Sequence, residues 1–195
     1  MSTRTNKIIL VVGNRGTGKT DFCKNILDTL PQPKKLILDT FDNPAWRNMK
    51  TWNHPEWESR VIPIMPIEDI ERHRSGMYRI AESDTIHSQD MIDKHCMDTG
   101  LIMEDASRYF PLNLSRSQKN YLLNSKQKNT DIILVFHYLA TVPPELVKMA
   151  DYITLFKTGE GDFNDKKYFH TGFREAFEYL KKAKNRFENV TINLQ

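Results

Sequence analysis

Short apolar runs alternate with longer, more polar stretches along most of this chain. Each run is rich in Ile, Leu, Val or Phe and is short, which is typical of strands buried on both faces of a sheet. The runs lie at 8–12, 36–40, 61–64, 77–80, 101–103, 131–136 and 151–156. Because Pro63 interrupts the third run, we expect that strand at an edge or an end of the sheet.

The stretches between these runs carry apolar residues at helical spacing. Phe22, Ile26, Leu27 and Leu30 follow the first run, and Pro31 ends that helix. Further helices are predicted at 88–97, 115–128, 144–149 and 173–187. Strands that alternate with helices predict an α/β fold with three layers, in which helices flank a mainly parallel sheet.

A length of 195 residues is most simply one domain, which we expect to span 1–195. The segment 41–57 holds Trp46, Trp52 and Trp57, and these rings predict a packed loop or short helix. That segment is either a satellite core or a contact with another subunit or with DNA. The last helix has a basic outer face, which is either a solvated surface or a phosphate contact. Its basic residues are Lys181, Lys182, Lys184 and Arg186.

A glycine-rich segment follows the first run and leads into the first helix. It reads Gly13-Asn14-Arg15-Gly16-Thr17-Gly18-Lys19-Thr20 and is a complete G-x-x-x-x-G-K-T motif. In such a loop the backbone N–H groups surround phosphates, the lysine reaches the β- and γ-phosphates, and the Thr hydroxyl binds Mg²⁺. We therefore expect ATP and Mg²⁺ as cofactors. The expected nucleotide contacts are Asn14, Arg15, Gly16, Thr17, Gly18, Lys19, Thr20 and Asp21.

Two adjacent acids, Glu104 and Asp105, end the apolar run that starts at Leu101. Mg²⁺ on nucleotide phosphates needs one carboxylate, and hydrolysis needs a second to orient and deprotonate water. Neighbouring strand residues point to opposite faces, so the two acids can divide these tasks. An apolar strand that merely ends in acids is the alternative, but the preceding phosphate-binding motif favours the catalytic interpretation.

His137 ends the run 131–136, beside the acidic strand. A polar side chain at that position can sense the γ-phosphate, whereas the alternative is a histidine that only caps the strand or binds the backbone.

The composition excludes several classes of protein. The hydrophobic fraction is 39% and the charged fraction 27%, as in globular proteins, and no apolar run approaches the roughly 20 residues that cross a bilayer. Residues 1–7 are polar, so we expect no signal peptide and a cytoplasmic protein. Cys23 and Cys96 lack metal-ligand spacing. The net charge of +3 is compatible with nucleic acid without indicating it.

Together these motifs resemble the HerA–FtsK group of P-loop ATPases, which have the RecA-like (ASCE) fold. The resemblance rests on the P-loop, on Leu101 to Phe110 as the Walker B stretch, and on Phe136 to Val147 as the sensor strand and the helix after it. Small members of the group include packaging ATPases of membrane-containing icosahedral viruses and Zot-like proteins of filamentous phages. The resemblance implies a homo-oligomeric ring, usually a hexamer, that moves double-stranded DNA and binds ATP between neighbouring subunits.

The chain departs from the family pattern at three places. The acid pair of the family is usually Asp followed by Glu, whereas this chain has Glu104 followed by Asp105. By position, Glu104 would bind the metal and Asp105 would activate the water. The sensor is commonly Gln, and here it is His137. Where relatives place a trans-acting arginine, this chain has Lys126, which cannot form a bidentate clamp. Arg108 and Arg116 are the other candidates for that duty.

We therefore expect a Mg²⁺-dependent ATPase that translocates double-stranded DNA, as the genome-packaging motor of a virus or phage, with a portal or membrane protein as a further possible partner. The expected catalytic groups are Lys19, Glu104, Asp105 and His137, completed by a basic residue from a neighbour. One rival is a Zot-like assembly or export ATPase. Another is a small-molecule or nucleoside kinase, whose arginine-rich lid has only the segment 72–79 as a candidate here.

Overall fold

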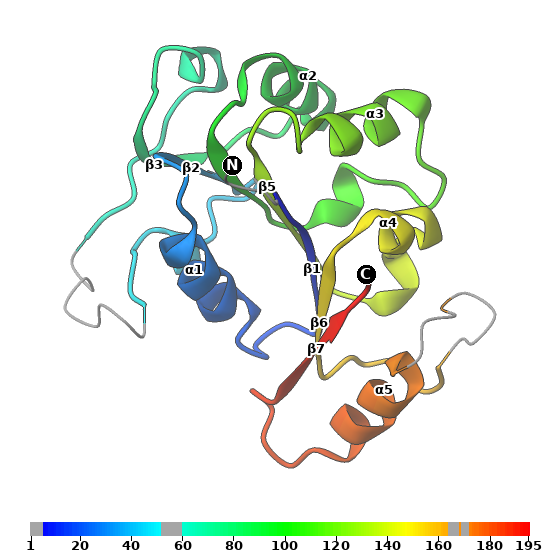
Figure 1. The fold of residues 1–195 in the computed structure, drawn as a ribbon. Coiled ribbons are helices and arrows are strands. Elements are labelled where there is room, and N and C mark those ends of the chain that lie inside the picture. Colours follow the sequence, from blue (N-terminus) through cyan, green and yellow to red (C-terminus); the bar gives the residue numbers. More distant parts are fainter. Residues whose placement is uncertain (1–5, 52–59, 164–167, 169–171) are drawn as a thin grey trace.

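The computed structural model describes residues 6–51, 60–163, 168 and 172–195. Its strands are β1 (Ile8–Val12), β2 (Lys34–Leu38), β3 (Gly76–Ile80), β4 (Thr99–Met103), β5 (Asp131–Phe136), β6 (Tyr152–Phe156) and β7 (Asn189–Asn193). They form a seven-stranded sheet in the order β3-β2-β4-β5-β1-β6-β7 (Figure 1). All neighbours from β3 to β6 are parallel, and β7 joins β6 antiparallel. The predicted α/β fold with a mainly parallel sheet is confirmed.

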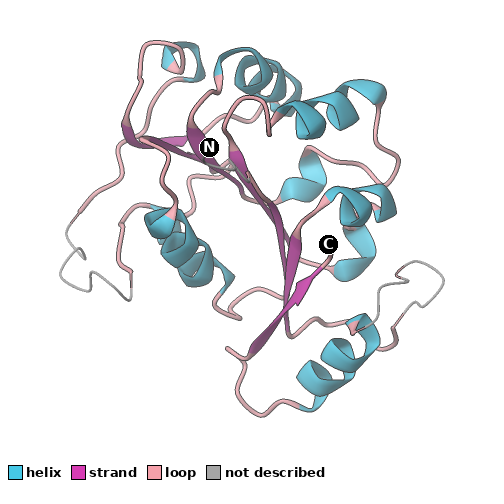
Figure 2. Ribbon diagram, in the orientation of Figure 1, coloured by secondary structure: helices cyan, strands magenta, loops and turns pink. Residues whose placement is uncertain are grey.

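Helices cover both faces of the sheet, as Figures 1 and 2 show. The α-helices are α1 (Lys19–Thr29), α2 (Thr85–His95), α3 (Arg116–Asn124), α4 (Pro144–Met149) and α5 (Phe173–Lys182). Short 3-10 helices are η1 (Pro44–Trp46), η3 (Ile67–Asp69), η4 (Ala106–Arg108) and η5 (Leu139–Thr141). One apolar core joins the sheet to α2, α3, α4 and α5, and the other joins it to α1 and to Trp46, Met49 and Ile62. The molecule therefore has three layers.

Strand β1 shows why the short apolar runs become strands. Ile8, Leu10 and Val12 pack in the core on one side of the sheet, and Val11 packs in the core on the other side. A strand buried on both faces has no polar side to present to water, which explains its continuous apolar sequence. Because β1 lies between two parallel neighbours, its backbone groups are also satisfied within the sheet.

Two buried aspartates fix the amino-terminal ends of the central strands. The backbone N–H of Lys7 donates to Asp131 Oδ1 at 2.5 Å, and that of Ile8 donates to Asp151 Oδ2 at 2.8 Å. The amide of Gln32 donates to the other oxygen of Asp131 at 2.5 Å. Each buried carboxylate thus accepts hydrogen bonds that replace water, and the register of β1 with its neighbours is held at this end.

The structure differs from the sequence prediction at several elements, and the helix predicted at 115–128 ends at Asn124. The run 61–64 forms only isolated bridges, Asn48 with Val61 and Ile64 with Arg79, since Pro63 cannot donate to a ladder. The last helix ends at Lys182 rather than at 187. Strand β7 was not predicted, because only Val190 and Ile192 of its residues face the core, and the rest are polar and exposed. Of the predicted tryptophan cluster, Trp46 is buried, and Trp52 and Trp57 lie outside the described residues.

A buried ion pair ties the edge strand β3 to the loop after β2. Arg79 is 3% exposed, and its Nη1 lies 3.1 Å from Asp39 Oδ2 and 2.7 Å from Asp42 Oδ1. Asp39 Oδ1 also accepts the backbone N–H of Asn43 at 3.0 Å. Burial raises the pKa of Asp39, which its bonds to Asn43 and Arg79 oppose. The loop that leads to η1 therefore depends on one guanidinium.

We predict that Arg79→Ala lowers the free energy of unfolding by about 3–5 kcal/mol, because it leaves the carboxylate of Asp39 buried and unpaired. The matched control is Arg72→Ala, which breaks a pair with Asp69 on the surface, where the Arg72 side chain is 81% exposed. That change should cost less than about 1 kcal/mol. Urea unfolding followed by circular dichroism measures both, and equal losses would contradict the prediction.

Candidate nucleotide site

The site lies where the carboxyl ends of the parallel strands meet. The loop 13–18 leaves β1, crosses this edge and enters α1. Gly13 N–H donates to Phe136 O of β5 at 3.1 Å, and Asn14 N–H donates to Lys157 O, just after β6, at 2.9 Å. The loop is therefore bonded to both strands that flank β1, so that its position is set by the sheet.

The three glycines of this loop are required for different physical reasons. Gly16 and Gly18 have φ angles of 77° and 90°, in the left-handed region that disfavours side chains. Gly13 is required by space, since a Cβ there would lie 2.5 Å from Phe156 Cβ and 3.2 Å from Thr17 Oγ1. Left-handed backbone and close approach therefore require glycine at different positions of the loop.

Lys19 is the first residue of α1, and its side chain folds back over the loop. Its Nζ donates to Gly13 O at 2.5 Å and to Asn14 O at 2.8 Å. Burial lowers the pKa of Lys19, and the nearby carboxylate of Glu104 acts in the opposite direction. The ammonium is therefore held at the loop by carbonyl oxygens, and an anion bound in the loop would favour its charged form.

Glu104 directly follows β4, and its N–H donates to Leu38 O of β2 at 3.0 Å. Its Oε2 is buried and has no hydrogen-bond partner among the described residues. Burial raises the pKa of Glu104 to about 7, opposed first by Lys19 and then by the indole N–H of Trp46. That N–H lies close enough to favour the carboxylate, but it too lacks a hydrogen-bond partner within the described part of the chain.

Asp105 turns the chain out of the strand. It has φ 51° and ψ 54°, a left-handed conformation, and its Oδ1 accepts a bond from Ser107 Oγ at 2.8 Å. Because β4 ends at Met103, both acids lie in the turn, and the predicted alternation of strand faces is not what separates them. The chain takes a left-handed turn at Asp105, and a short polar residue tolerates that conformation.

His137 follows β5 and is half-buried beside the P-loop. Burial lowers its pKa, the charge on Lys19 lowers it further, and Asp105 acts in the opposite direction. A histidine with a lowered pKa is neutral at pH 7 and can donate one hydrogen bond and accept another.

These groups surround one open cavity of about 870 Å³. The predicted residues that line it are Arg15, Gly16, Gly18, Lys19, Thr20, Asp21, Glu104, Asp105 and His137. Within the described residues, Asn14 and Thr17 do not line the cavity, because they act inside the loop, where Thr17 Oγ1 donates to Asn14 O at 2.8 Å. The structure therefore brings the two acids, the histidine and the P-loop together.

Residues from two further loops also line the cavity. The loop after β2 supplies Asp39, Phe41, Asn43, Pro44 and Ala45, and the loop before β7 supplies Arg186 and Phe187. Asp39 directly follows β2, so it lies at the same edge of the sheet as the P-loop and the acids. The other residues follow no motif, and Arg186 and Phe187 were predicted on the last helix instead.

The three candidates for a trans-acting cation lie outside this cavity in the described part of the chain. The exposed guanidinium of Arg108 lies 4.7 Å from the ring centroid of Phe41, and Arg116 begins α3. Lys126 lies 3.9 Å from Asp151, at the opposite edge of the sheet. The segment 72–79, the candidate for the lid of a kinase, does not form a lid, because Arg79 is buried in β3.

The residues present fit Mg²⁺. No three His, Cys, Asp or Glu side chains of the described residues group closely enough to hold a metal by themselves. Thr20 and Glu104 line the same cavity, and Glu104 offers a buried oxygen without a partner. Such a pair suits an ion that takes its other ligands from phosphates and water, as Mg²⁺ does.

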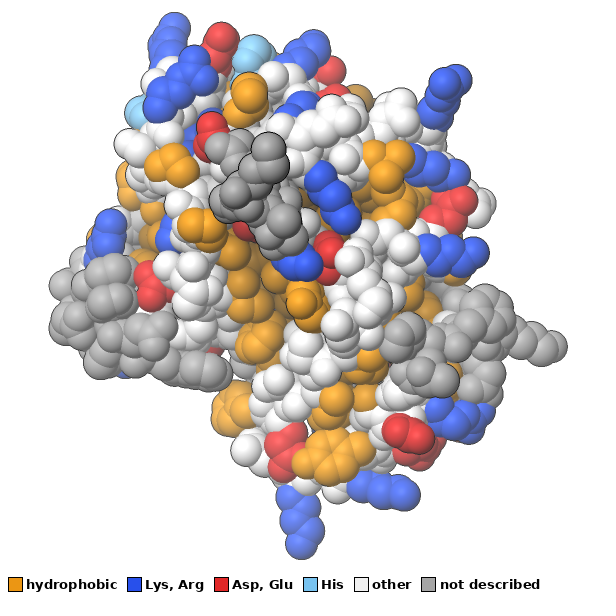
Figure 3. All heavy atoms as spheres, viewed as in Figure 1, with side chains coloured by type: hydrophobic (Ala, Val, Ile, Leu, Met, Phe, Trp, Pro, Cys, Tyr) orange, Lys and Arg blue, Asp and Glu red, His pale blue; other side chains and the backbone are white. Residues whose placement is uncertain are grey.

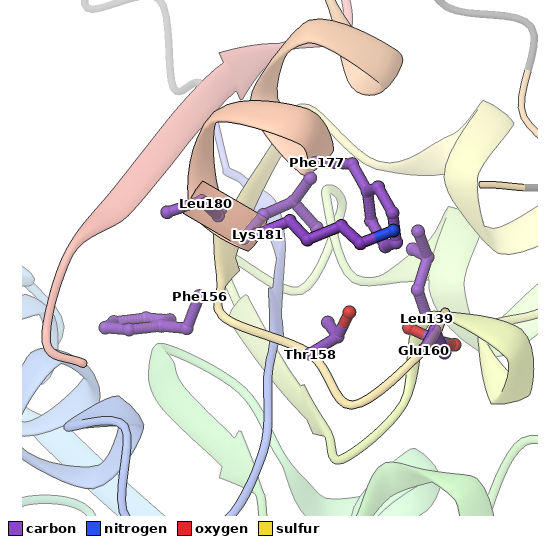
Figure 4. Close-up of a pocket in the computed structure, with 8 residues that line it drawn as sticks. Leu139, Phe156, Thr158, Glu160, Phe177, Leu180 and Lys181 are labelled. Carbon is purple, nitrogen blue, oxygen red and sulfur yellow. The ribbon is translucent and has the colours of Figure 1, made fainter. Parts of the chain in front are cut away.

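A second space lies behind the P-loop, between β6 and α5. Phe156, Phe177 and Leu180 are among the residues that line it, and Figure 4 shows Lys181 extending from α5 beside Phe177 toward Leu139. Its volume of about 10 Å³ holds about one water molecule. Lys181 Nζ donates to Gly161 O, so that this predicted surface lysine ties α5 to the loop after β6.

The strand order and the loop between β1 and α1 define an α/β fold of the P-loop NTPase type. Solved structures with this fold include the genome packaging NTPase B204 from Sulfolobus turreted icosahedral virus 2 in complex with sulfate. It is 17% identical to this chain with a TM-score of 0.71, over 97% of this chain and 92% of that chain.

Two further structures are similar. The DNA-packaging ATPase B204 from Sulfolobus turreted icosahedral virus has a TM-score of 0.68 at 16% identity, over 98% of this chain and 94% of that chain. EssC (ATPases 2 and 3) from Geobacillus thermodenitrificans has a TM-score of 0.54 at 9% identity, over 97% of this chain and 38% of that chain. No family model and no curated protein match the chain. The predicted resemblance is thus confirmed for the fold.

In the described residues, no helix combines the length and the apolar character that a membrane crossing requires.

We predict that Glu104→Gln raises the melting temperature of the metal-free, nucleotide-free protein more at pH 8 than at pH 5. The unfolded chain releases this proton near pH 4.5 and the folded chain near pH 7, so the wild type loses stability as pH rises between these values. The loss is at most about 3 kcal/mol, and the glutamine variant does not undergo it.

Differential scanning calorimetry in EDTA measures this difference. The control is Glu175→Gln, at an exposed position of α5, which should change the melting temperature similarly at both pH values. An advantage of Glu104→Gln that is the same at pH 5 and pH 8 would contradict the buried, raised pKa.

Proposed function

We propose that this chain is a Mg²⁺-dependent ATPase that moves double-stranded DNA, as the genome-packaging motor of a virus or phage. One observation carries the proposal: a P-loop lysine, two acids and a histidine line the same cavity. The likeness in fold to the packaging NTPase B204 supports the packaging role. We further propose action in the host cytoplasm, with a portal or membrane protein as partner.

Nucleotide binding is assigned to the P-loop. Backbone N–H groups of the loop and the N-terminus of α1 hold the phosphates, and Lys19 exchanges its carbonyl partners for β- and γ-phosphate oxygens. Thr20 and Glu104 would hold Mg²⁺, which would neutralise charge on those phosphates. Glu104 must release its proton to take this role, and the metal charge would favour that release.

Hydrolysis is assigned to Asp105 and His137. Asp105 orients a water molecule and accepts its proton as the oxygen attacks the γ-phosphorus and the bond to ADP breaks. His137, neutral at pH 7, donates a hydrogen bond to a γ-phosphate oxygen and so distinguishes ATP from ADP.

The proposal also includes assembly of this chain into a homo-oligomeric ring, which usually has six subunits. Arg108, Arg116 or Lys126 of a neighbouring subunit would reach the γ-phosphate, so that isolated subunits hydrolyse slowly. On the face seen in Figure 3, Lys and Arg side chains of the described residues are scattered among other side chains and do not gather into one basic patch. Contacts of several subunits with the DNA backbone do not require such a patch on one subunit.

We predict that double-stranded DNA stimulates ATP hydrolysis, that the stimulation rises cooperatively with protein concentration, and that it weakens as salt increases. Lys19→Ala should abolish the activity. Lys94→Ala, an exposed change on α2, should leave it intact. Phosphate release assays measure these rates. Activity proportional to protein and indifferent to DNA would contradict the translocase and favour the Zot-like assembly ATPase, whereas transfer of phosphate to a small acceptor would favour a kinase.

We predict that Asp105→Asn lowers the rate of hydrolysis at least about 100-fold while ATP still binds within a few fold of wild type. Glu104→Gln should instead raise the Mg²⁺ concentration required for half-maximal rate. Single-turnover hydrolysis and equilibrium binding, each titrated with Mg²⁺, separate these effects. If the two variants exchange phenotypes, Glu104 is the base and Asp105 the metal ligand.

A further inference from the structure

The order of strands fixes the direction in which a nucleotide lies, if the proposed ATPase function holds. The acids and His137, which must face the γ-phosphate, follow β4 and β5, on one side of β1. The P-loop follows β1 itself. The α-phosphate, the ribose and the base therefore extend to the other side of β1, toward β6 and β7.

An exposed aromatic side chain stands on that side of the cavity. Phe187 precedes β7, is 51% exposed, and lines the same cavity as Lys19. Its Cδ1 lies 3.2 Å from the point that a Cβ of Gly18 would occupy, so the ring rests against the last glycine of the P-loop. The guanidinium of Arg186 lies 4.7 Å from the centroid of the Phe187 ring.

The loop that carries this ring is held in place. Phe187 N–H donates to Asn185 Oδ1 at 3.0 Å, and the Asn189 amide donates to Phe187 O at 3.4 Å. Lys157 Nζ donates to Ala183 O at 3.3 Å, and Lys157 O accepts the N–H of Asn14 in the P-loop. Lys157 thus connects the segment before the ring to the P-loop.

We propose that Phe187, with Arg186 stacked beside it, is the platform on which the base of the nucleotide packs. A base offers a flat π-face, and aromatic rings and guanidinium planes stack on it without reading its edge. Packing a base there would also cover apolar surface that is otherwise exposed to water. Phe187 is thus a specificity-determining residue for a ligand that carries a base over one that carries phosphates alone.

A second exposed aromatic residue lines the same cavity and serves as the control position. Phe41 is 70% exposed and also has a stacked guanidinium, that of Arg108, at 4.7 Å. It follows β2, however, which lies beyond the acids on the γ-phosphate side. A base directed toward β7 cannot reach it, so the two rings separate the effect of an exposed ring from that of its position.

The test is calorimetric titration of a non-hydrolysable ATP analogue and of inorganic tripolyphosphate, each with Mg²⁺. Phe187→Ala should weaken the analogue about tenfold and leave tripolyphosphate within about twofold. Phe187→Trp should retain the affinity for the analogue, and Phe41→Ala should leave it within about twofold. Melting temperatures of the variants establish that they are folded.

The proposal is overturned if Phe187→Ala binds the analogue as tightly as wild type. It is also overturned if this variant loses analogue and tripolyphosphate by the same factor, because the ring would then only support the P-loop. Failure of the proposed function has a different signature, in which the wild type binds neither ligand or Lys19→Ala changes neither affinity.

Discussion

Burial of β1 between two parallel neighbours is the constraint on which the rest of the structure depends. Its side chains contribute to both cores, and its backbone pairs on both sides, so the strand cannot shift without breaking two ladders. Parallel strands direct all of their carboxyl ends to one edge. The loops that leave β1, β4 and β5 therefore meet, and residues more than a hundred positions apart in the sequence share one cavity.

Burial away from water is the common cause of the shifted pKa values of the ionisable groups in this cavity. Burial lowers the pKa of Lys19 and of His137 and raises that of Glu104, so each group is moved toward its neutral form. The charges partly compensate one another, because Lys19 and Glu104 each favour the ionised state of the other. A bound anion and cation would complete this compensation, which links occupancy of the site to its protonation.

The edge of the sheet that carries the candidate site could be predicted because its residues form local patterns in the sequence. The P-loop, the acid pair and His137 each directly follow an apolar strand, and strand ends of a parallel sheet converge. Contacts between distant segments leave no such pattern. The pairing of Arg79 in β3 with Asp39 just after β2 joins residues 40 positions apart, and neither belongs to a local motif. Strand β7 has just two apolar residues in alternation, too few to be distinguished from a loop, and the position of Phe187 beside the P-loop depends on that strand.

The first glycine of the P-loop has a consequence for how this sequence can change over evolutionary time. A side chain at position 13 would collide with the Cβ of Phe156, at 2.5 Å. Every residue except glycine carries that atom, so replacing Phe156 with a smaller side chain would not make room. Drift at position 13 is therefore blocked by the sheet itself, and selection on nucleotide binding is not needed to maintain this glycine while β6 stays in its place.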